Sequence, residues 1–119
     1  MITELKDNEI FVFGSNKAGL HLGSSAKQAH EQFKAEWGVG EGLTGQSYAF
    51  PTLDENFNQL LFKVLRKSRD KLYKCCEENK NKAFLLTKVG CGIAGYKEES
   101  IKNLFKNKPI NLILPDDWY

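Results

Sequence analysis

Cysteine and histidine are scarce in this chain. The cysteines are Cys75, Cys76 and Cys91, and the histidines are His21 and His30. An odd number of cysteines without a framework spacing excludes a disulfide scaffold. No C-x-x-C or H-x-x-x-H pair occurs among these residues, which excludes the common zinc sites. We therefore expect a reduced protein that carries neither a metal ion nor a cofactor.

Long apolar runs and an excess of one sign of charge are missing as well. No apolar stretch approaches the roughly 20 residues that cross a bilayer. Residues 1–8 lack the basic-then-apolar pattern of a signal peptide. The net charge of +2 is too small to indicate a nucleic-acid partner. We expect one cytoplasmic domain over residues 1–119, without a membrane segment.

Short apolar segments recur along the chain and predict strands. Runs rich in branched and aromatic residues are typical of buried strands. They occupy residues 10–13 (IFVF), 47–50 (SYAF), 83–87 (AFLLT) and 110–114 (INLIL), with residues 2–5 (ITEL) as an edge strand.

Helical patterns lie between these strands. The first runs from Ser24 to Gly38, with Ser25 and Gln28 at the spacing of a capping box. A second capping box, Thr52 to Glu55, predicts a longer helix with an apolar stripe over residues 57–72, and a third helix is predicted over residues 98–106. The alternation predicts an α/β fold, a three-layer α/β/α sandwich around a mostly parallel or mixed sheet.

The glycines are confined to two parts of the sequence. All ten lie within residues 14–45 and 90–95. Each window begins where a predicted buried strand ends, and each leads to a helix. Ligands bind at that end of an α/β sheet, because main-chain N–H groups and helix N-termini converge there on anions. Plain turns would also use glycine, but the clustering at two strand ends favours ligand loops.

Two phosphate motifs fit these windows poorly. Residues 14–19 have the glycine spacing of a P-loop, but Leu20 and His21 follow where lysine and a hydroxyl residue are required. Residues 90–95 (GCGIAG) match G-x-G-x-x-G, with Asp116 at the distance of the ribose-binding acid. Because three residues follow Asp116, a second mononucleotide half has no room. Neither a triphosphatase nor a dinucleotide oxidoreductase is expected.

Together the two windows resemble a known family. Residues 11–16 (FVFGSN), followed by Gly19 and Gly23, resemble the first ligand loop of macro domains. Residues 88–96 (KVGCGIAGY) resemble their second loop, and residues 45–51 (GQSYAFP) resemble the strand between the two. The order of elements agrees over residues 10 to 118. Residues 40–48 (GEGLTGQSY) further resemble a compact group of bacterial and phage proteins related to macro domains.

Macro domains bind ADP-ribose, and some hydrolyse ADP-ribosyl esters. The resemblance implies that Asn16 hydrogen-bonds the terminal ribose, that main-chain N–H groups of both loops hold the diphosphate, and that Tyr96 covers the ligand. Trp118 or Tyr119 would stack on the adenine. The implied ligand-binding residues are Gly14, Ser15, Asn16, Gly19, Leu20, Gly23, Gly90, Cys91, Gly92, Ile93, Ala94, Gly95, Tyr96 and Trp118. The partner would be a free nucleotide or an ADP-ribosylated target. The family's early aspartate, which accepts the adenine amino group, has no clear match, so another phosphorylated nucleoside stays open.

Individual residues allow other interpretations. Asn16 could cap its own turn, and His21 could act as a base, contact phosphate, or serve only the loop. Cys91 is better explained as a small buried spacer than as a nucleophile, since no arginine lies near it. If the protein is an ADP-ribosyl hydrolase, Asn16 and His21 are the candidate catalytic residues. With no obvious acid–base pair, we rank binding above catalysis.

A second hypothesis comes from the basic stretch between Lys63 and Lys82. A non-enzymatic interaction module, such as a phage or host-defence factor, could contact protein or RNA through this helix. Acidic residues interrupt the stretch at Asp70, Glu77 and Glu78, which favours an ordinary solvated helix face.

Overall fold

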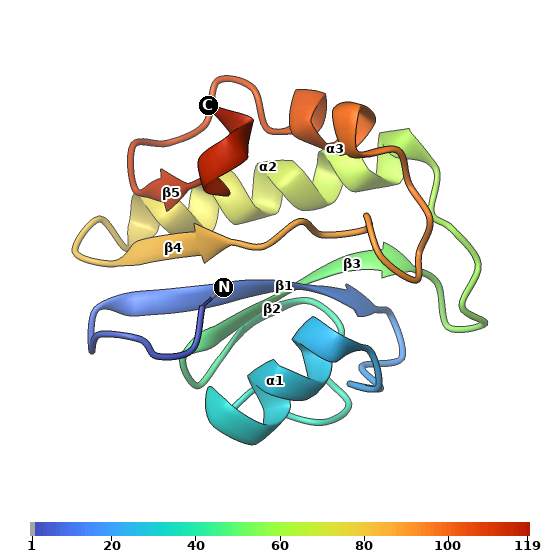
Figure 1. Ribbon diagram of the computed structural model, residues 1–119, viewed down its shortest axis with the longest axis horizontal. Coiled ribbons are helices and arrows are strands. Elements are labelled where there is room, and N and C mark those ends of the chain that lie inside the picture. Colours follow the sequence, from blue (N-terminus) through green and yellow to red (C-terminus); the bar gives the residue numbers. More distant parts are fainter. Residues whose placement is uncertain (1) are drawn as a thin grey trace.

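The protein has an α/β fold built on a mixed five-stranded sheet. The computed structural model describes residues 2–119. Along the chain the elements are β1 (Glu9–Asn16), α1 (Ser24–Gln32), β2 (Gly42–Thr44), β3 (Ser47–Leu53), α2 (Phe62–Glu78), β4 (Ala83–Leu86), α3 (Glu98–Leu104), β5 (Leu112–Ile113) and a 3-10 helix (Asp116–Trp118). The strand order is β2-β3-β1-β4-β5 (Figure 1). Strand β2 is antiparallel to β3, and the other neighbours are parallel.

The connections between parallel strands explain where the helices lie. From β1 the chain passes through α1 to β3 on one side, and from β3 it passes through α2 to β4 on the other side of β1. Because such crossovers are right-handed, two connections that run in opposite directions place their helices on opposite faces of the sheet. Figure 1 shows α1 on one face and α2 with α3 on the other. The direction of connection reverses at β1, and ligands bind at such switch points in α/β sheets.

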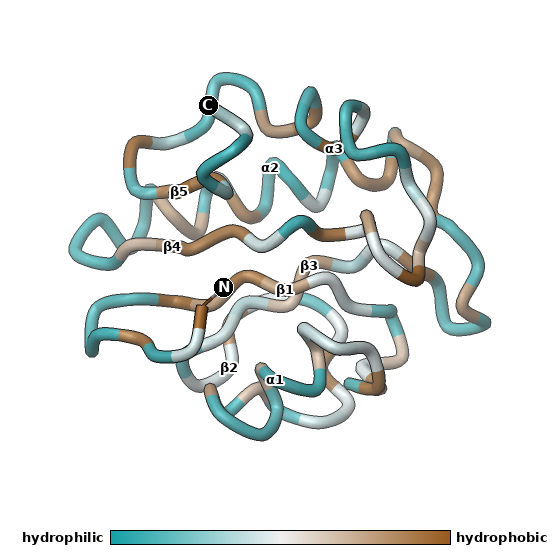
Figure 2. The backbone as a smooth tube through the Cα atoms, in the orientation of Figure 1, coloured by the Kyte–Doolittle hydropathy of each residue, from teal (hydrophilic) through white to brown (hydrophobic). Residues whose placement is uncertain are grey.

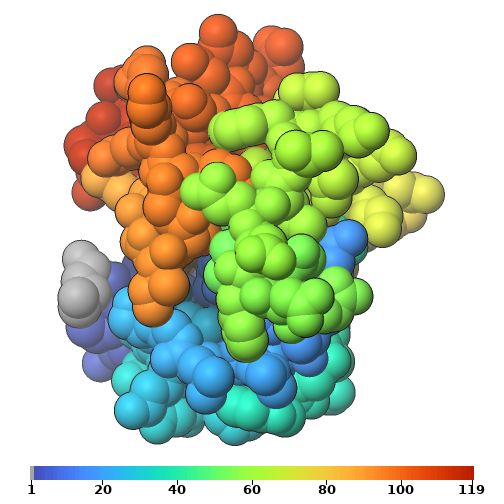
Figure 3. Space-filling view, turned by 90° about the vertical axis from the view of Figure 1, so that its right-hand side faces the viewer, coloured from blue at the N-terminus to red at the C-terminus, as the bar shows by residue number. Residues whose placement is uncertain are grey.

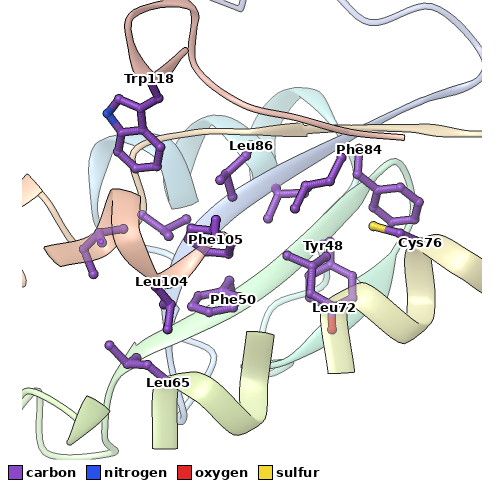
Figure 4. Close-up of a cluster of buried hydrophobic side chains, with 14 of the residues drawn as sticks. Tyr48, Phe50, Leu65, Leu72, Cys76, Phe84, Leu86, Leu104, Phe105 and Trp118 are labelled. Atoms are coloured by element: carbon purple, nitrogen blue, oxygen red, sulfur yellow. The ribbon is translucent and has the colours of Figure 1, made fainter. Parts of the chain in front are cut away.

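The central strand β1 contributes to two separate cores. Ile10 and Val12 belong to the larger core cluster, whereas Phe11 and Phe13 belong to a smaller one with Ala26 of α1. This follows from the alternation of side chains along a strand. The tube of Figure 2 is most hydrophobic along the middle of the sheet, in β1 and β4. Figure 4 shows the larger cluster, with residues from β3, β4, α2 and the C-terminal segment packed together.

The predicted strands are found with two corrections. The strand expected over residues 110–114 is reduced to β5, and the exposed Ile110 lies outside it. Residues 2–5 form no strand; Ile2 and Leu5 instead pack as side chains against the smaller core cluster. The short edge strand β2 was not expected, because its three residues carry no recognisable apolar pattern.

Both capping boxes were wrong. Gly23 is the N-cap of α1 and no side chain caps this helix, while the Gln28 amide donates to the Ile2 carbonyl. The helix ends at Gln32 instead of Gly38, since Lys34 has a left-handed backbone with φ 62°. Thr52 lies in β3, and α2 begins ten residues later, at Phe62.

The apolar stripe of α2 also differs from the expected one. Its buried residues are Leu65, Ser68, Leu72 and Cys76, and Phe57 and Leu61 are exposed instead. The predicted third helix is confirmed but ends at Leu104 instead of residue 106, and Ile101, Leu104 and Phe105 are buried.

Candidate functional site

A cleft of about 320 Å³ opens at the carboxyl ends of β1, β3 and β4. This edge faces the viewer in Figure 3, where the first loop, the segment after β3 and the second loop surround a hollow. We call it the loop cleft. Its lining residues are Gly14, Ser15, Asn16, Leu20, Leu22, Gly23, Ser24, Ser25, Ala26, Thr52, Leu53, Phe57, Thr87, Lys88, Val89, Gly90, Gly92, Ile93 and Ala94. Both glycine-rich windows therefore contribute to one cleft.

Asn16 lines the cleft, but its side chain is engaged with its own loop. The amide Nδ2 donates to the Leu20 carbonyl over 2.8 Å, and Oδ1 accepts from the Leu20 N–H over 3.1 Å. Gly19, at the turn between them, has φ 72° and packs so closely on Gly38 that an added Cβ would lie 2.3 Å from its carbonyl carbon. The Asn16 side chain thus stabilises the conformation of the first loop. Gly19 is required for packing against Gly38 and does not line the cleft.

His21 points away from the loop cleft. Its ring is buried edge-on against Phe13, and its Nε2 lies 2.6 Å from the Glu36 carbonyl oxygen. It also contacts Trp37 edge-on, with ring centroids 5.9 Å apart. This environment anchors the first loop to the segment after α1. A histidine enclosed by aromatic rings does not reach a ligand in the cleft, so the structure does not support His21 as a catalytic residue.

The second loop is a tight glycine turn over the cleft. Gly90 and Gly95 have left-handed backbones, with φ 76° and 78°. The turn closes through hydrogen bonds from the Gly95 N–H to the Gly92 carbonyl and from the Tyr96 N–H to the Gly90 carbonyl. Cys91 is half-buried with its Sγ toward the Val89 carbonyl oxygen, and burial raises the pKa of its thiol. A protonated thiol outside the cleft fits a spacer, and Cys91 and Gly95 do not line the cleft.

Tyr96 and Trp118 are core residues. The Tyr96 hydroxyl lies 2.8 Å from the Thr52 carbonyl oxygen and 2.6 Å from that of Leu60, so the ring ties the second loop to β3. Trp118 is 4% exposed, packs in the larger core cluster (Figure 4) and donates its Nε1–H to Glu98 Oε1. Neither ring lines the loop cleft or the second cavity of the structure, so the structure does not support Tyr96 as a cover for the ribose or Trp118 as the ring that stacks on a base.

Main-chain donors at the cleft lack protein acceptors. In the second loop the N–H groups of Gly92, Ile93 and Ala94 have no hydrogen-bond acceptor among residues 2–119. The first turn of α1 is also uncapped by side chains, which leaves the N–H groups of Ser24, Ser25 and Ala26 available. A helix N-terminus carries roughly half a positive charge. The cleft therefore offers unpaired donors from two loops to one anion.

At two positions of the cleft, neither close packing nor a left-handed backbone requires glycine. An added Cβ on Gly92 would meet nothing within 4 Å, and one on Gly23 would meet only Ile93 Cδ1 at 3.9 Å. Neither has a left-handed backbone. Gly90 is different, because an added Cβ would lie 2.8 Å from the Tyr96 ring. Packing and backbone conformation thus explain Gly90, while Gly23 and Gly92 leave space in the cleft.

A second cavity, of about 610 Å³, adjoins the loop cleft. We call it the side cavity. It lies between α1, the ends of β4 and β5, and the start of the 3-10 helix, and includes the apolar residues Phe11, Ile113 and Pro115. Ser24, Ser25, Thr87 and Lys88 line both cavities. One elongated molecule could therefore occupy the two together.

Lys88 lies where the cavities meet, but its charge is neutralised. Its Nζ is 2.7 Å from Asp117 Oδ2 and 2.8 Å from Glu98 Oε1. These hydrogen bonds, that of Asp117 first, raise the pKa of Lys88 and lower the pKa of both carboxyl groups. The side chain joins the second loop to α3 and the 3-10 helix. It is a structural bridge more than an anion ligand.

Sequence reasoning missed the segment after β3. Phe57 lines the cleft, whereas the apolar pattern of the sequence predicts it in a helix. The polar run Asp54 to Asn58 was the available signal, since aspartate and asparagine favour turns. In the structure Asp54 Oδ1 accepts hydrogen bonds from the Asn56 and Asn58 N–H groups.

Comparison with protein-family models, curated proteins and solved structures finds no match for the chain. Among residues 2–119, no group of three acidic, cysteine or histidine side chains is arranged to hold a metal ion. None of the helices in the same range combines the length and apolar character needed to span a bilayer.

Proposed function

We propose that the loop cleft binds the diphosphate of ADP-ribose or a related nucleotide, as a compact macro domain-like α/β/α sandwich would. The observation that carries the proposal is the pair Gly23 and Gly92, which face one cleft and are required neither by packing nor by backbone conformation. Glycine at such positions lets main-chain N–H groups approach a phosphate closely. The unpaired amides beside each glycine supply the donors.

The adjoining side cavity supports an elongated ligand. A diphosphate at the two loops leaves one end of the molecule next to the side cavity, whose apolar residues suit a nucleobase. Pockets of several hundred Å³ are usual for ligands of this size. The ligand would be a free nucleotide or the ADP-ribosyl group of a modified target.

The proposed activity is binding. The side chains that line the cleft give little support for hydrolysis in addition. In the part of the chain that the structure describes, Lys88 is the one titratable side chain lining the cleft, and its ammonium is already paired with two carboxylates. No side chain in the cleft is thus available to take or give a proton near neutral pH. Any hydrolysis would depend on the ligand's own diphosphate to activate water.

The test uses a graded series at Gly92. Calorimetric titration of the wild-type protein with ADP-ribose and ADP should show binding, and Gly92→Ala and Gly92→Val should weaken it progressively, by about 10-fold or more for valine. Unfolding without ligand should be the same in all three proteins, because the added atoms project into open space. Absence of heat with wild-type protein at millimolar ADP-ribose, ADP or NAD would reject the proposal.

A further inference from the structure

Three exposed apolar side chains surround the mouth of the loop cleft. Leu22 is 66% exposed, Phe57 50% and Ile93 87%. All three line the cleft, and each comes from a different connection: the first loop, the segment after β3 and the second loop. Large apolar side chains gathered around a concave site commonly mark a place that a ligand covers.

Phe57 is held at the mouth by an organised turn. Its backbone is left-handed with φ 64°, a conformation that aromatic residues rarely adopt. The Phe57 N–H donates to the Asp54 carbonyl over 3.1 Å. Asp54 Oδ1 accepts from Asn56 N–H over 2.8 Å and from Asn58 N–H over 3.0 Å. These hydrogen bonds hold Phe57 in its strained backbone conformation. The Phe57 ring has no aromatic partner among residues 2–119. Strained residues cluster at ligand sites, and a ring without a partner is available to stack on a ligand.

Ile93 reaches toward the opposite side of the mouth. Its Cδ1 is the one atom that an added Cβ on Gly23 would approach within 4 Å, so the tip of the second loop lies near the start of α1. The three mouth residues carry no charge. None of the three lines the side cavity, which shares Ser24, Ser25, Thr87 and Lys88 with the loop cleft.

We propose that this mouth binds a planar aromatic group attached to the sugar beyond the diphosphate. The inference rests on the proposed function and specifies its ligand class: a nucleotide diphosphate with a flat group at each end, which is a dinucleotide. One flat group occupies the side cavity, the diphosphate contacts the two loops, and the second flat group stacks on Phe57 between Leu22 and Ile93. Stacking suits any ring with a π-face.

The test compares ligands that differ at one end. NAD and ADP-ribose share the adenosine diphosphate and second ribose, but only NAD carries a pyridine ring on that ribose. Calorimetry should give wild-type protein a Kd for NAD about 5- to 150-fold lower than for ADP-ribose, the range that one stacked ring contributes. Diadenosine diphosphate, which carries an uncharged aromatic ring on the second ribose, should keep the advantage.

Variants at position 57 assign the effect to the ring. Phe57→Asn suits the left-handed backbone and should bring the ratio of the ADP-ribose Kd to the NAD Kd down to about one. Phe57→Trp should retain the preference. Ile110→Ala is the matched control, because Ile110 is 92% exposed and lines neither cavity.

Each of the remaining calorimetric outcomes would contradict one part of the inference or of the proposed function. Equal wild-type affinity for NAD and ADP-ribose would overturn the inference and leave the proposed function intact. An equal loss for both ligands in Phe57→Asn would also overturn it, because the ring would then serve a group common to both. Loss of the preference with diadenosine diphosphate would replace stacking by attraction of the charged ring. Binding of neither ligand to wild-type protein would reject the proposed function itself.

Discussion

Gly23 and Ile93 lie on opposite sides of the loop cleft and nearly touch. An added Cβ on Gly23 would be 3.9 Å from Ile93 Cδ1, an ordinary van der Waals contact. Gly23 is the N-cap of α1 and Ile93 is at the tip of the second loop, so the approach brings the two glycine windows together. Both residues line the cleft, next to main-chain N–H groups that have no protein acceptor among residues 2–119.

Gly90 and Gly92 should respond differently to the same substitution. Gly90→Ala should lower the free energy of unfolding by on the order of 2–4 kcal/mol, from left-handed strain and from overlap with the Tyr96 ring. Gly92→Ala should change it by less than about 0.5 kcal/mol, as for most surface positions. Urea unfolding measures both. Equal stability of the two variants would contradict the separation between packing glycines and cleft glycines.

Asn16 should act as a positioning residue for the first loop. Asn16→Ala removes both hydrogen bonds to the Leu20 main chain and should cost about 1–3 kcal/mol of stability. Amide hydrogen exchange at Leu20 should become faster, because its N–H loses its acceptor. The exposed Asn103, on α3 and lining neither cavity, provides Asn103→Ala as the control. Lost ligand affinity with unchanged exchange at Leu20 would instead mean that Asn16 contacts the ligand directly.

The Lys88 bridge should weaken in acid. Hydrogen bonds from Lys88 lower the pKa of Glu98 and of Asp117, and a bond from Trp118 adds to the effect on Glu98. Because both pKa values are lower in the folded state, their stabilisation is complete above the usual values of 4.5 and 3.8. It is lost as the pH falls through the lowered values.

The comparison of Lys88→Met with wild type tests this bridge. Thermal unfolding should show a small deficit for the variant at pH 7, since both acids are solvent-exposed, and the deficit should shrink below pH 4.5. Lys97→Met is the control, as Lys97 is exposed and forms no ion pair among residues 2–119. A deficit that stays constant from pH 7 to pH 3 would show that the ion pairs with Glu98 and Asp117 are not its cause.

Helix predictions failed where side chains had tertiary partners. The spacing of Thr52 and Glu55 resembles a capping box, yet Thr52 continues β3, and its hydroxyl donates to the Ser15 carbonyl of β1. Pairing with β1 satisfies main-chain groups of β3 that a helix would otherwise use. Likewise Gln28, expected to cap α1, donates to the Ile2 carbonyl. Local spacing carries no information about a partner that is distant in the sequence.

Sequence alone determined the α/β class, the central strands and the position of the two glycine windows at strand ends. Those features depend on local patterns: apolar runs that must be buried, and glycines where a turn or close approach is needed. Tertiary structure decided which predicted site residues face the cleft, because the roles of His21, Tyr96 and Trp118 depend on carbonyl and carboxylate groups from other segments. It also decided that Phe57 borders the site, since strand pairing, not helical periodicity, directs the chain after β3.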